Sequence, residues 1–137
     1  MSDHLKEIPP AADLLGREIV SVDPLSGEVK LRFTAKEEFA NRHGTVQGGM
    51  LAAMLDSATG NAVMAKLPSH LTALTIRLDT QFLKPAALGV ITATARLTNQ
   101  DERSAEARAE LTDSEGKIVA TARAELRIRE RKNTSRM

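Results

Sequence analysis

The residue types best suited to chemistry in this chain lie in one short segment, residues 41–49, and at Asp56, seven residues after its end. The segment holds three glycines, Gly44, Gly48 and Gly49, which leave backbone N–H groups accessible and let another molecule approach the chain closely. If a helix starts at the last two, its first turn offers unpaired N–H donors and the positive end of the helix dipole. Both stabilise a carbonyl oxygen that becomes negative during nucleophilic attack. The alternative is that the glycines only form a tight turn and let the helix pack closely.

Asp56 is the residue that could attack such a carbonyl or activate water for the attack. It lies two helical turns beyond Gly49, on the same helix face, beside Leu55 and Ala58. Burying a carboxylate among apolar residues is costly, so its presence there indicates a function. The alternative is an Asp at the edge of the helix that stays solvated. Seven residues span roughly 10 Å along a helix axis, too far for Asp56 and the glycine amides of one chain to act on one carbonyl. Two antiparallel helices across a twofold axis would solve this, so the spacing predicts a homodimer with two equivalent, shared sites.

The helix that must carry these groups is predicted over residues 48–66. Its apolar residues recur in steps of three and four, which is typical of a helix with one broad apolar face. These positions are Met50, Leu51, Met54, Leu55, Ala58, Ala62 and Ala65. Pro68 ends the pattern.

Strands are predicted on both sides of that helix. A turn at residues 23–27 joins two short strands into a hairpin before it. Four strands follow, at residues 74–83, 90–98, 103–112 and 118–128, with links of hairpin length between them. The order β-β-α-β-β-β-β predicts an α+β fold with one long central helix on a mostly antiparallel sheet, which is the hotdog architecture. One domain is expected over residues 16–130, with an arm or short helix at 1–15 and a frayed tail at 131–137.

Composition excludes several other classes of protein. The 137 residues, 42% hydrophobic and 27% charged with a net charge of +1, describe an ordinary globular domain rather than a nucleic-acid binder. There is no cysteine for a disulfide or thiolate site, and the three histidines lack metal-ligand spacing, so no metal is expected. No apolar run approaches the roughly 20 residues that span a bilayer, and the start lacks the apolar region of a signal peptide. A cytoplasmic protein with no membrane partner is the expectation.

The pattern Asn-x-x-Gly-Thr-Val-x-Gly-Gly, followed after six residues by Asp, resembles the signature of PaaI-like acyl-CoA thioesterases, which are related to 4-hydroxybenzoyl-CoA thioesterase in the hotdog superfamily. Strand order and length agree over residues 15–130. The resemblance implies hydrolysis of an acyl-CoA thioester to free acid and coenzyme A without a cofactor, because a thioester is already an activated acyl group. It also implies that Asp56 is the general base or nucleophile, that Gly48 and Gly49 stabilise the oxyanion, and that Asn41 positions water or the thioester.

Gln47 departs from that family, many members of which have His-Gly-Gly where this chain has Gln-Gly-Gly. Glutamine can hydrogen-bond a carbonyl or a water but cannot carry a proton, so proton transfer must rest on Asp56. We expect Gln47 to orient the thioester. His43 and Gly44 are further candidates for substrate contact, although a loop histidine is more often a surface residue. Thr75 matches a position where relatives carry Ser or Thr near the acid, although a strand threonine is usually only a β-former.

The acyl pocket is expected between helices at the dimer interface. We predict that Met50 and Met54 line it together with Leu51 and Leu55, although Met residues at helical spacing are first of all core. The small, aromatic-poor core, with three Phe and no Trp or Tyr, also favours association into a homodimer or a homotetramer.

Three questions stay open at the level of sequence. The run Arg127, Arg129, Arg131, Lys132 could meet the phosphates of coenzyme A or could simply keep a strand edge solvated. A hydratase or dehydratase on the same fold would need an Asp and His pair, which Gln47 disfavours. A non-catalytic acyl-CoA-binding protein would retain the glycine loop but would not need Asp56.

Overall fold

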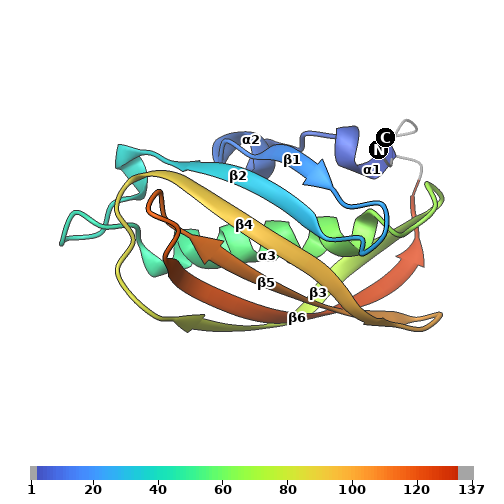
Figure 1. Ribbon diagram of the computed structural model, residues 1–137. Helices are drawn as coiled ribbons and strands as arrows, with labels where there is room; N and C mark the ends of the chain where they lie inside the picture. Colours follow the sequence, from blue (N-terminus) through green and yellow to red (C-terminus); the bar gives the residue numbers. More distant parts are fainter. Residues whose placement is uncertain (1–2, 133–137) are drawn as a thin grey trace.

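A computed structural model describes residues 3–132 of the chain (Figure 1). Two short helices, α1 (Asp3–Lys6) and α2 (Pro10–Leu14), precede strands β1 (Glu18–Val22) and β2 (Val29–Ala35). A 3-10 turn, η1 (Glu37–Phe39), leads to the long helix α3 (Gly48–Met64). Strands β3 (Leu71–Phe82), β4 (Gly89–Gln100), β5 (Ser104–Thr112) and β6 (Ile118–Glu130) complete the fold. Within this range no helix is both long enough and apolar enough to cross a membrane.

The six strands of the described chain form one sheet in the order β1-β2-β4-β5-β6-β3, and all neighbours are antiparallel. Helix α3 packs against one face of this sheet and contacts β2 to β6 (Figure 1). The arrangement confirms the predicted hotdog fold, with one long helix on an antiparallel sheet.

One predicted connection is wrong, because β3 pairs with β6 instead of forming a hairpin with β4. The N–H of Leu83 donates to Val119 O at 2.9 Å, which keeps the end of β3 beside β6. The link at residues 83–88 then pairs with the loop before α3, where Val46 N–H donates to Ala86 O at 2.9 Å. A short link between two strands therefore does not show that those two strands pair with each other. As a result β3 is an edge strand.

The inner face of the sheet is built largely from alanine. Alternation along β4, β5 and β6 buries one residue in two against α3, and many of these are small. They include Ala93, Ala95, Ala107, Ala122 and Ala124. Small side chains let the helix lie close to the sheet, while Phe33, Met54 and Leu55 fill the remaining core without exposure to solvent. The opposite face of α3, which carries Asp56, is not covered by the sheet.

The two ends of the described chain meet beside α3. The predicted arm at residues 1–15 folds into α1 and α2, and the first turn of α2 begins with Pro10, whose fixed φ suits that position. Arg131, the first residue of the predicted frayed tail, is held in place: its N–H donates to His70 O at 2.8 Å, and its guanidinium pairs with Glu7. Residues 133–137 of that predicted tail lie outside the described residues.

Candidate functional site

The loop before α3 is a small hairpin organised by Asn41. Its side-chain Oδ1 accepts the N–H groups of His43 at 2.9 Å and Thr45 at 3.2 Å. Gly44 closes the turn with φ of +80°, a left-handed conformation that favours glycine. The tight-turn explanation therefore holds for Gly44. The oxygen of Asn41 is engaged within the loop, and the role in positioning water or the thioester that the resemblance implies for Asn41 stays a prediction.

Helix α3 begins with two backbone N–H groups that have no acceptor in the described chain. Gln47 is the N-cap residue and makes no side-chain cap. Its carbonyl accepts the N–H groups of Met50 at 2.9 Å and Leu51 at 3.2 Å. The N–H groups of Gly48 and Gly49 remain as free donors at the positive end of a helix of 17 residues, an arrangement that favours an anionic oxygen.

Nothing inside the protomer requires Gly49 to be glycine. Its φ is not positive, and a Cβ added there would meet no atom within 4 Å. A Cβ at Gly48 would meet the ring of Phe82 at 3.6 Å, which is an ordinary van der Waals contact. Close packing within one chain therefore does not explain this pair. The space at Gly49 is open to a ligand or to a second chain.

Asp56 projects from the uncovered face of α3 and is fixed by the edge strand. The hydroxyl of Thr75 on β3 donates to Asp56 Oδ1 at 2.7 Å. The pairing of β3 with β6 shifts between Thr75 and Arg77, so that Ile76 is an extra, bulged residue next to this contact. No group in the described chain hydrogen-bonds the other oxygen, Oδ2. One oxygen of Asp56 is thus held while the other is free.

Asp56 and Thr75 lie in a groove of about 600 Å³ that follows the uncovered face of α3. Its floor is formed by small helix residues, and one wall is formed by β3. The other wall comes from the N-terminal segment, for which the sequence indicated no function. The floor includes Ala53, Ser57 and Gly60, and the second wall includes Ala12, Leu15 and Arg17. These wall residues carry no motif, and only the folding of α1 and α2 against α3 brings them to the site.

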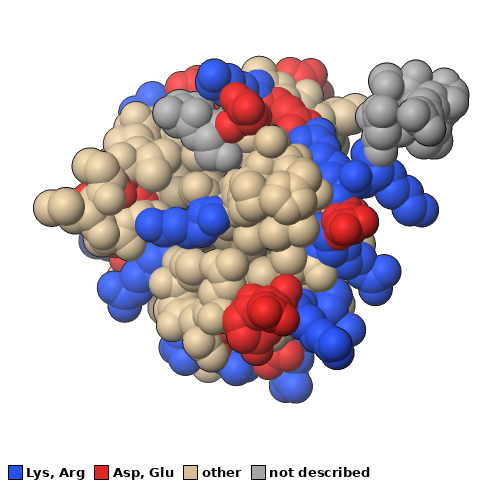
Figure 2. Space-filling view, turned by 90° about the vertical axis from the view of Figure 1, so that its right-hand side faces the viewer, with Lys and Arg blue, Asp and Glu red and all other residues tan. Residues whose placement is uncertain are grey.

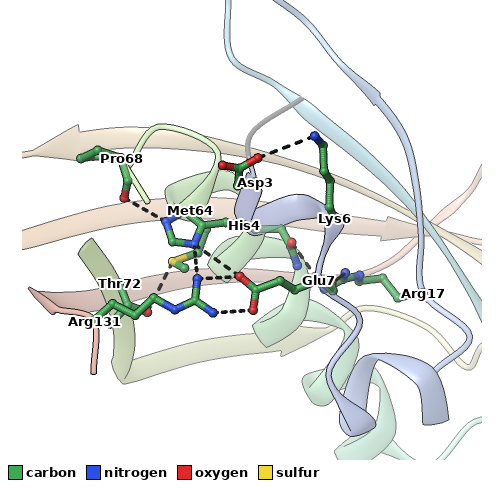
Figure 3. Close-up of polar contacts among 10 residues, drawn as sticks. Asp3, His4, Lys6, Glu7, Arg17, Met64, Pro68, Thr72 and Arg131 are labelled. Carbon is green, nitrogen blue, oxygen red and sulfur yellow. Dashed lines mark hydrogen bonds and ion pairs between the residues drawn. The ribbon is translucent and has the colours of Figure 1, made fainter. Parts of the chain in front are cut away.

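The far end of the groove is polar. Its side chains join the two ends of the described chain (Figure 3). Both carboxylate oxygens of Glu7 accept from the guanidinium of Arg131, each at 2.6 Å. This hydrogen bonding lowers the pKa of Glu7 and raises that of Arg131. The buried ring of His4 lies beside them, with Nε2 3.0 Å from Pro68 O. Arg17 donates to the main-chain oxygen of Glu7 at 2.6 Å, and burial lowers the pKa of Arg17.

The predicted loop residues are not brought to Asp56 of the same chain. His43, Gly44 and Gln47 are exposed in or beside the hairpin loop at the start of α3. Asp56 lies more than roughly 10 Å farther along the helix axis. Within one protomer, the structure therefore separates the free amides from the free carboxylate oxygen, as the helix spacing predicts.

The predicted contribution of Met54, Leu51 and Leu55 to an acyl pocket is wrong for the single chain. Met54 has no exposed surface and faces the sheet, together with Leu51 and Leu55. Its side chain is core because it lies on the side of α3 that the sheet covers. Met50 is half-buried near the helix start, and it stays a candidate for substrate contact.

Basic side chains gather along one side of the end of the molecule where β6 terminates (Figure 2). Arg127, Arg129 and Lys132 are exposed there, whereas Arg131 is paired with Glu7. Across residues 3–132, no three His, Asp or Glu side chains are grouped so that they could hold a metal ion.

Comparison with known families shows to which family the chain belongs. The model of the thioesterase superfamily matches residues 43–120, which include most of the loop, all of α3 and the strands β3, β4 and β5. The chain belongs to the thioesterase superfamily. This thioesterase-superfamily chain is 34% identical over 121 residues to a Halobacterium salinarum protein provisionally named an esterase, covering 80% of each chain.

Solved structures give the same placement. A protein from Ralstonia eutropha JMP134, provisionally named a thioesterase and related to phenylacetic acid degradation, is 37% identical with a TM-score of 0.85. The match covers 88% of this chain and 91% of that one. The PaaI protein of the Escherichia coli phenylacetic acid degradation operon is 26% identical with a TM-score of 0.76, over 85% and 86% of the two chains. The predicted PaaI-like hotdog family is confirmed, and these relatives support a hydrolase.

Proposed function

We propose that the protein is an acyl-CoA thioesterase that hydrolyses a thioester to a free acid and coenzyme A. The observation that carries this proposal is the state of Asp56. One of its oxygens accepts from Thr75 at 2.7 Å, and the other is free above a groove of about 600 Å³. A carboxylate held in this way on a helix face of small residues suits attack on a carbonyl better than it suits support of the fold.

In the proposed reaction, the free oxygen of Asp56 takes a proton from a water molecule as that water attacks the thioester carbonyl. Alternatively it attacks the carbonyl itself and forms a mixed anhydride, which water then hydrolyses to the free acid and the regenerated carboxylate. The carbonyl oxygen becomes negative and is stabilised by the N–H groups of Gly48 and Gly49. The carbon–sulfur bond then breaks, and the sulfur leaves with the electron pair as the coenzyme A thiolate. Gln47, beside these amides, orients the thioester through hydrogen bonds. The step needs no cofactor.

The proposal requires a homodimer, because Asp56 lies roughly 10 Å along the helix axis from the glycine amides of its own chain. Two observations support one. Strand β3 is a 12-residue edge strand on which Leu74 and Ile76 are 54% and 55% exposed, so a second copy could extend the sheet there. Gly60 lies mid-helix, where glycine costs about 1 kcal/mol relative to alanine, yet a Cβ would meet nothing within 4 Å. The absent side chain leaves this part of α3 open to close approach, by a second chain or by the acyl group bound between two chains.

Thiol release from a panel of acyl-CoAs tests the activity. We expect the wild type to hydrolyse at least one of them and Asp56→Asn to lower kcat by about 100-fold or more. Asp79→Asn is the matched control, because Asp79 is also an exposed aspartate but pairs with Arg77 at 3.1 Å. Tight binding of acyl-CoA without hydrolysis of any chain length would contradict the proposal and favour a binding protein.

Mixing two inactive variants tests the shared site. Chains with Asp56→Ala are refolded together with chains carrying Gly49→Val, which blocks the space beside the helix start. In the mixed dimer one site keeps both an intact aspartate and intact amides, so we expect partial recovery of activity. No recovery in a confirmed mixed dimer would show that the two groups act within one chain.

A further inference from the structure

Arg17 places a cation at the far end of the groove without a carboxylate to neutralise it. Its guanidinium donates to the main-chain oxygen of Glu7 at 2.6 Å and lies 3.5 Å from Asn61 Oδ1. Its Nε atom is buried and has no hydrogen-bond acceptor. Arg17 forms no ion pair with any carboxylate of residues 3–132.

The carboxylate of Glu7, whose main-chain oxygen accepts from Arg17, is already engaged. Both oxygens of Glu7 bind Arg131 at 2.6 Å, so Arg17 reaches only the backbone of that residue (Figure 3). The groove-lining side chains Glu7, Arg17 and Arg131 carry one net positive charge between them. The other carboxylate of the groove, Asp56, lies on the wall formed by β3 and α3.

A partly buried cation without a counter-ion is costly, and the direction of the Arg17 pKa, lowered by burial, reflects that cost. An anionic group of a ligand in the groove would pair with the guanidinium and so remove this energetic cost. The planar fork of a guanidinium matches a carboxylate in particular, because two parallel N–H donors can meet its two oxygens.

We infer that Arg17 binds a carboxylate at the far end of the acyl chain, so that the preferred substrates are ω-carboxyacyl thioesters. This inference rests on the proposed function, because it requires the reacting carbonyl to lie at Asp56. Asn61, which contacts Arg17, is five residues beyond Asp56, or roughly 7.5 Å along the helix axis. Gly60 lies between these points on the helix, and the groove is also lined by Leu15; both suit the methylene groups of a short dicarboxylic acyl chain.

The test compares adipyl-CoA with hexanoyl-CoA, which have equal chain lengths and the same coenzyme A. A contact between Arg17 and a phosphate would affect both equally, so the ratio of their kcat/KM values reports on the distal carboxylate alone. We expect the wild type to favour adipyl-CoA by about tenfold or more, and Arg17→Gln to reduce that ratio by about tenfold or more. Arg17→Lys keeps the charge and should retain part of the preference.

Arg32→Gln is the matched control, because it also removes one positive charge but from the exposed face of β2, where Arg32 lies 3.4 Å from Glu18. In Arg32→Gln, the ratio of kcat/KM for adipyl-CoA to kcat/KM for hexanoyl-CoA should equal that of the wild type. A wild-type enzyme that hydrolyses hexanoyl-CoA as well as adipyl-CoA would overturn the inference and leave the proposed function standing. An equal loss with both substrates in Arg17→Gln would overturn it too, because Arg17 would then serve the coenzyme A moiety or the fold.

Three further results keep the inference decidable. If circular dichroism shows that Arg17→Gln does not fold, the wild-type ratio and Arg17→Lys decide in its place. If the wild type hydrolyses other acyl-CoAs of the panel but neither of these two, the inference fails and the proposed function stands. If it hydrolyses no acyl-CoA of the panel, the proposed function fails, and calorimetric binding of the two acyl-CoAs decides the role of Arg17. Tighter binding of adipyl-CoA supports the carboxylate site, and equal binding rejects it.

Discussion

Thr75 on β3 and Asp56 on α3, which lie 19 residues apart in sequence, are joined by a hydrogen bond of 2.7 Å in which the threonine hydroxyl is the donor. This bond links the edge of the sheet to the uncovered face of the helix. It restricts the rotation of the carboxylate and leaves one oxygen toward the groove. In the proposed reaction Thr75 is therefore a positioning residue for Asp56 and need not touch the substrate.

Replacing Thr75 tests that role. Thr75→Val keeps the shape of the side chain but removes the donor, so we expect kcat to fall by about tenfold while KM changes little, because substrate binding does not use the hydroxyl. Thr75→Ser restores the donor and should restore most of kcat. Steady-state kinetics with the best acyl-CoA of the panel measures both constants. A rise in KM with unchanged kcat would instead place Thr75 in direct contact with the substrate.

The Gly49→Ala variant tests whether the fold or the candidate site requires glycine at this position. Nothing lies within 4 Å of the added Cβ, and alanine favours a helix over glycine by up to about 1 kcal/mol, so the melting temperature should not fall. We expect kcat to drop, because the methyl group occupies the space beside the free amides. By contrast, Gly44→Ala should destabilise the fold by about 1 kcal/mol, because Gly44 has φ of +80°. Thermal unfolding and thiol release on both variants distinguish the two roles.

The ion pair between Glu7 and Arg131 predicts a pH-dependent contribution to stability. Arg131 lowers the pKa of Glu7 from its ordinary value of 4.5, so the contribution is complete above that pH and is lost as the pH falls through the lower, folded-state pKa. The Glu7 side chain is 47% exposed, which limits the effect to about 1 kcal/mol at most. Urea unfolding should show Glu7→Gln to be less stable than the wild type at pH 7, with the difference vanishing in acid.

Glu115→Gln serves as the control for that measurement, because Glu115 is 73% exposed and its contact with Lys117 is long, at 3.7 Å. Its stability should track that of the wild type at every pH. A deficit of Glu7→Gln that persists unchanged into acid would mean that packing, rather than the charge, accounts for it.

Ile76→Lys tests the proposed homodimer. A charge at this exposed position on the edge of β3 should oppose pairing of two edges, so sedimentation should show a shift toward monomer and activity should fall in parallel. Leu25→Lys is the matched control, because Leu25 is 95% exposed in the turn between β1 and β2. Full activity in a monomeric Ile76→Lys protein would contradict the shared site.

Much of the fold follows from periodicity in the sequence. The three- and four-residue steps placed the helix at 48–66, against 48–64 in the structure, and alternation located each of the six strands to within a few residues. The order of strands could not be obtained in this way, because the length of the link at residues 83–88 does not say that it pairs with the loop before α3. Several strand edges are compatible with each other, and tertiary packing determines which of them pair.

The candidate site, too, could be predicted from the sequence only in part. Asp56 and the glycine pair could be recognised from residue types and helix spacing, and the contact of Thr75 with Asp56 was foreseen only through the family resemblance. Arg17 could not be foreseen, because it follows a segment of mixed charge with no clear period, and only α1 and α2 bring it to the groove. Met54 was misplaced because helical spacing identifies an apolar face without saying what covers it.

The bulge at Ile76 also limits how two copies could pair. When a twofold axis relates two antiparallel strands, the residue numbers of every facing pair have the same sum, so the axis crosses the strand at one position. Backbone donors and acceptors at a bulge are out of step with a regular ladder. Two identical β3 edges therefore place bulge opposite bulge only in a register centred on Ile76. In any other register each bulge faces a regular stretch, so this one extra residue would help to select the alignment of the homodimer.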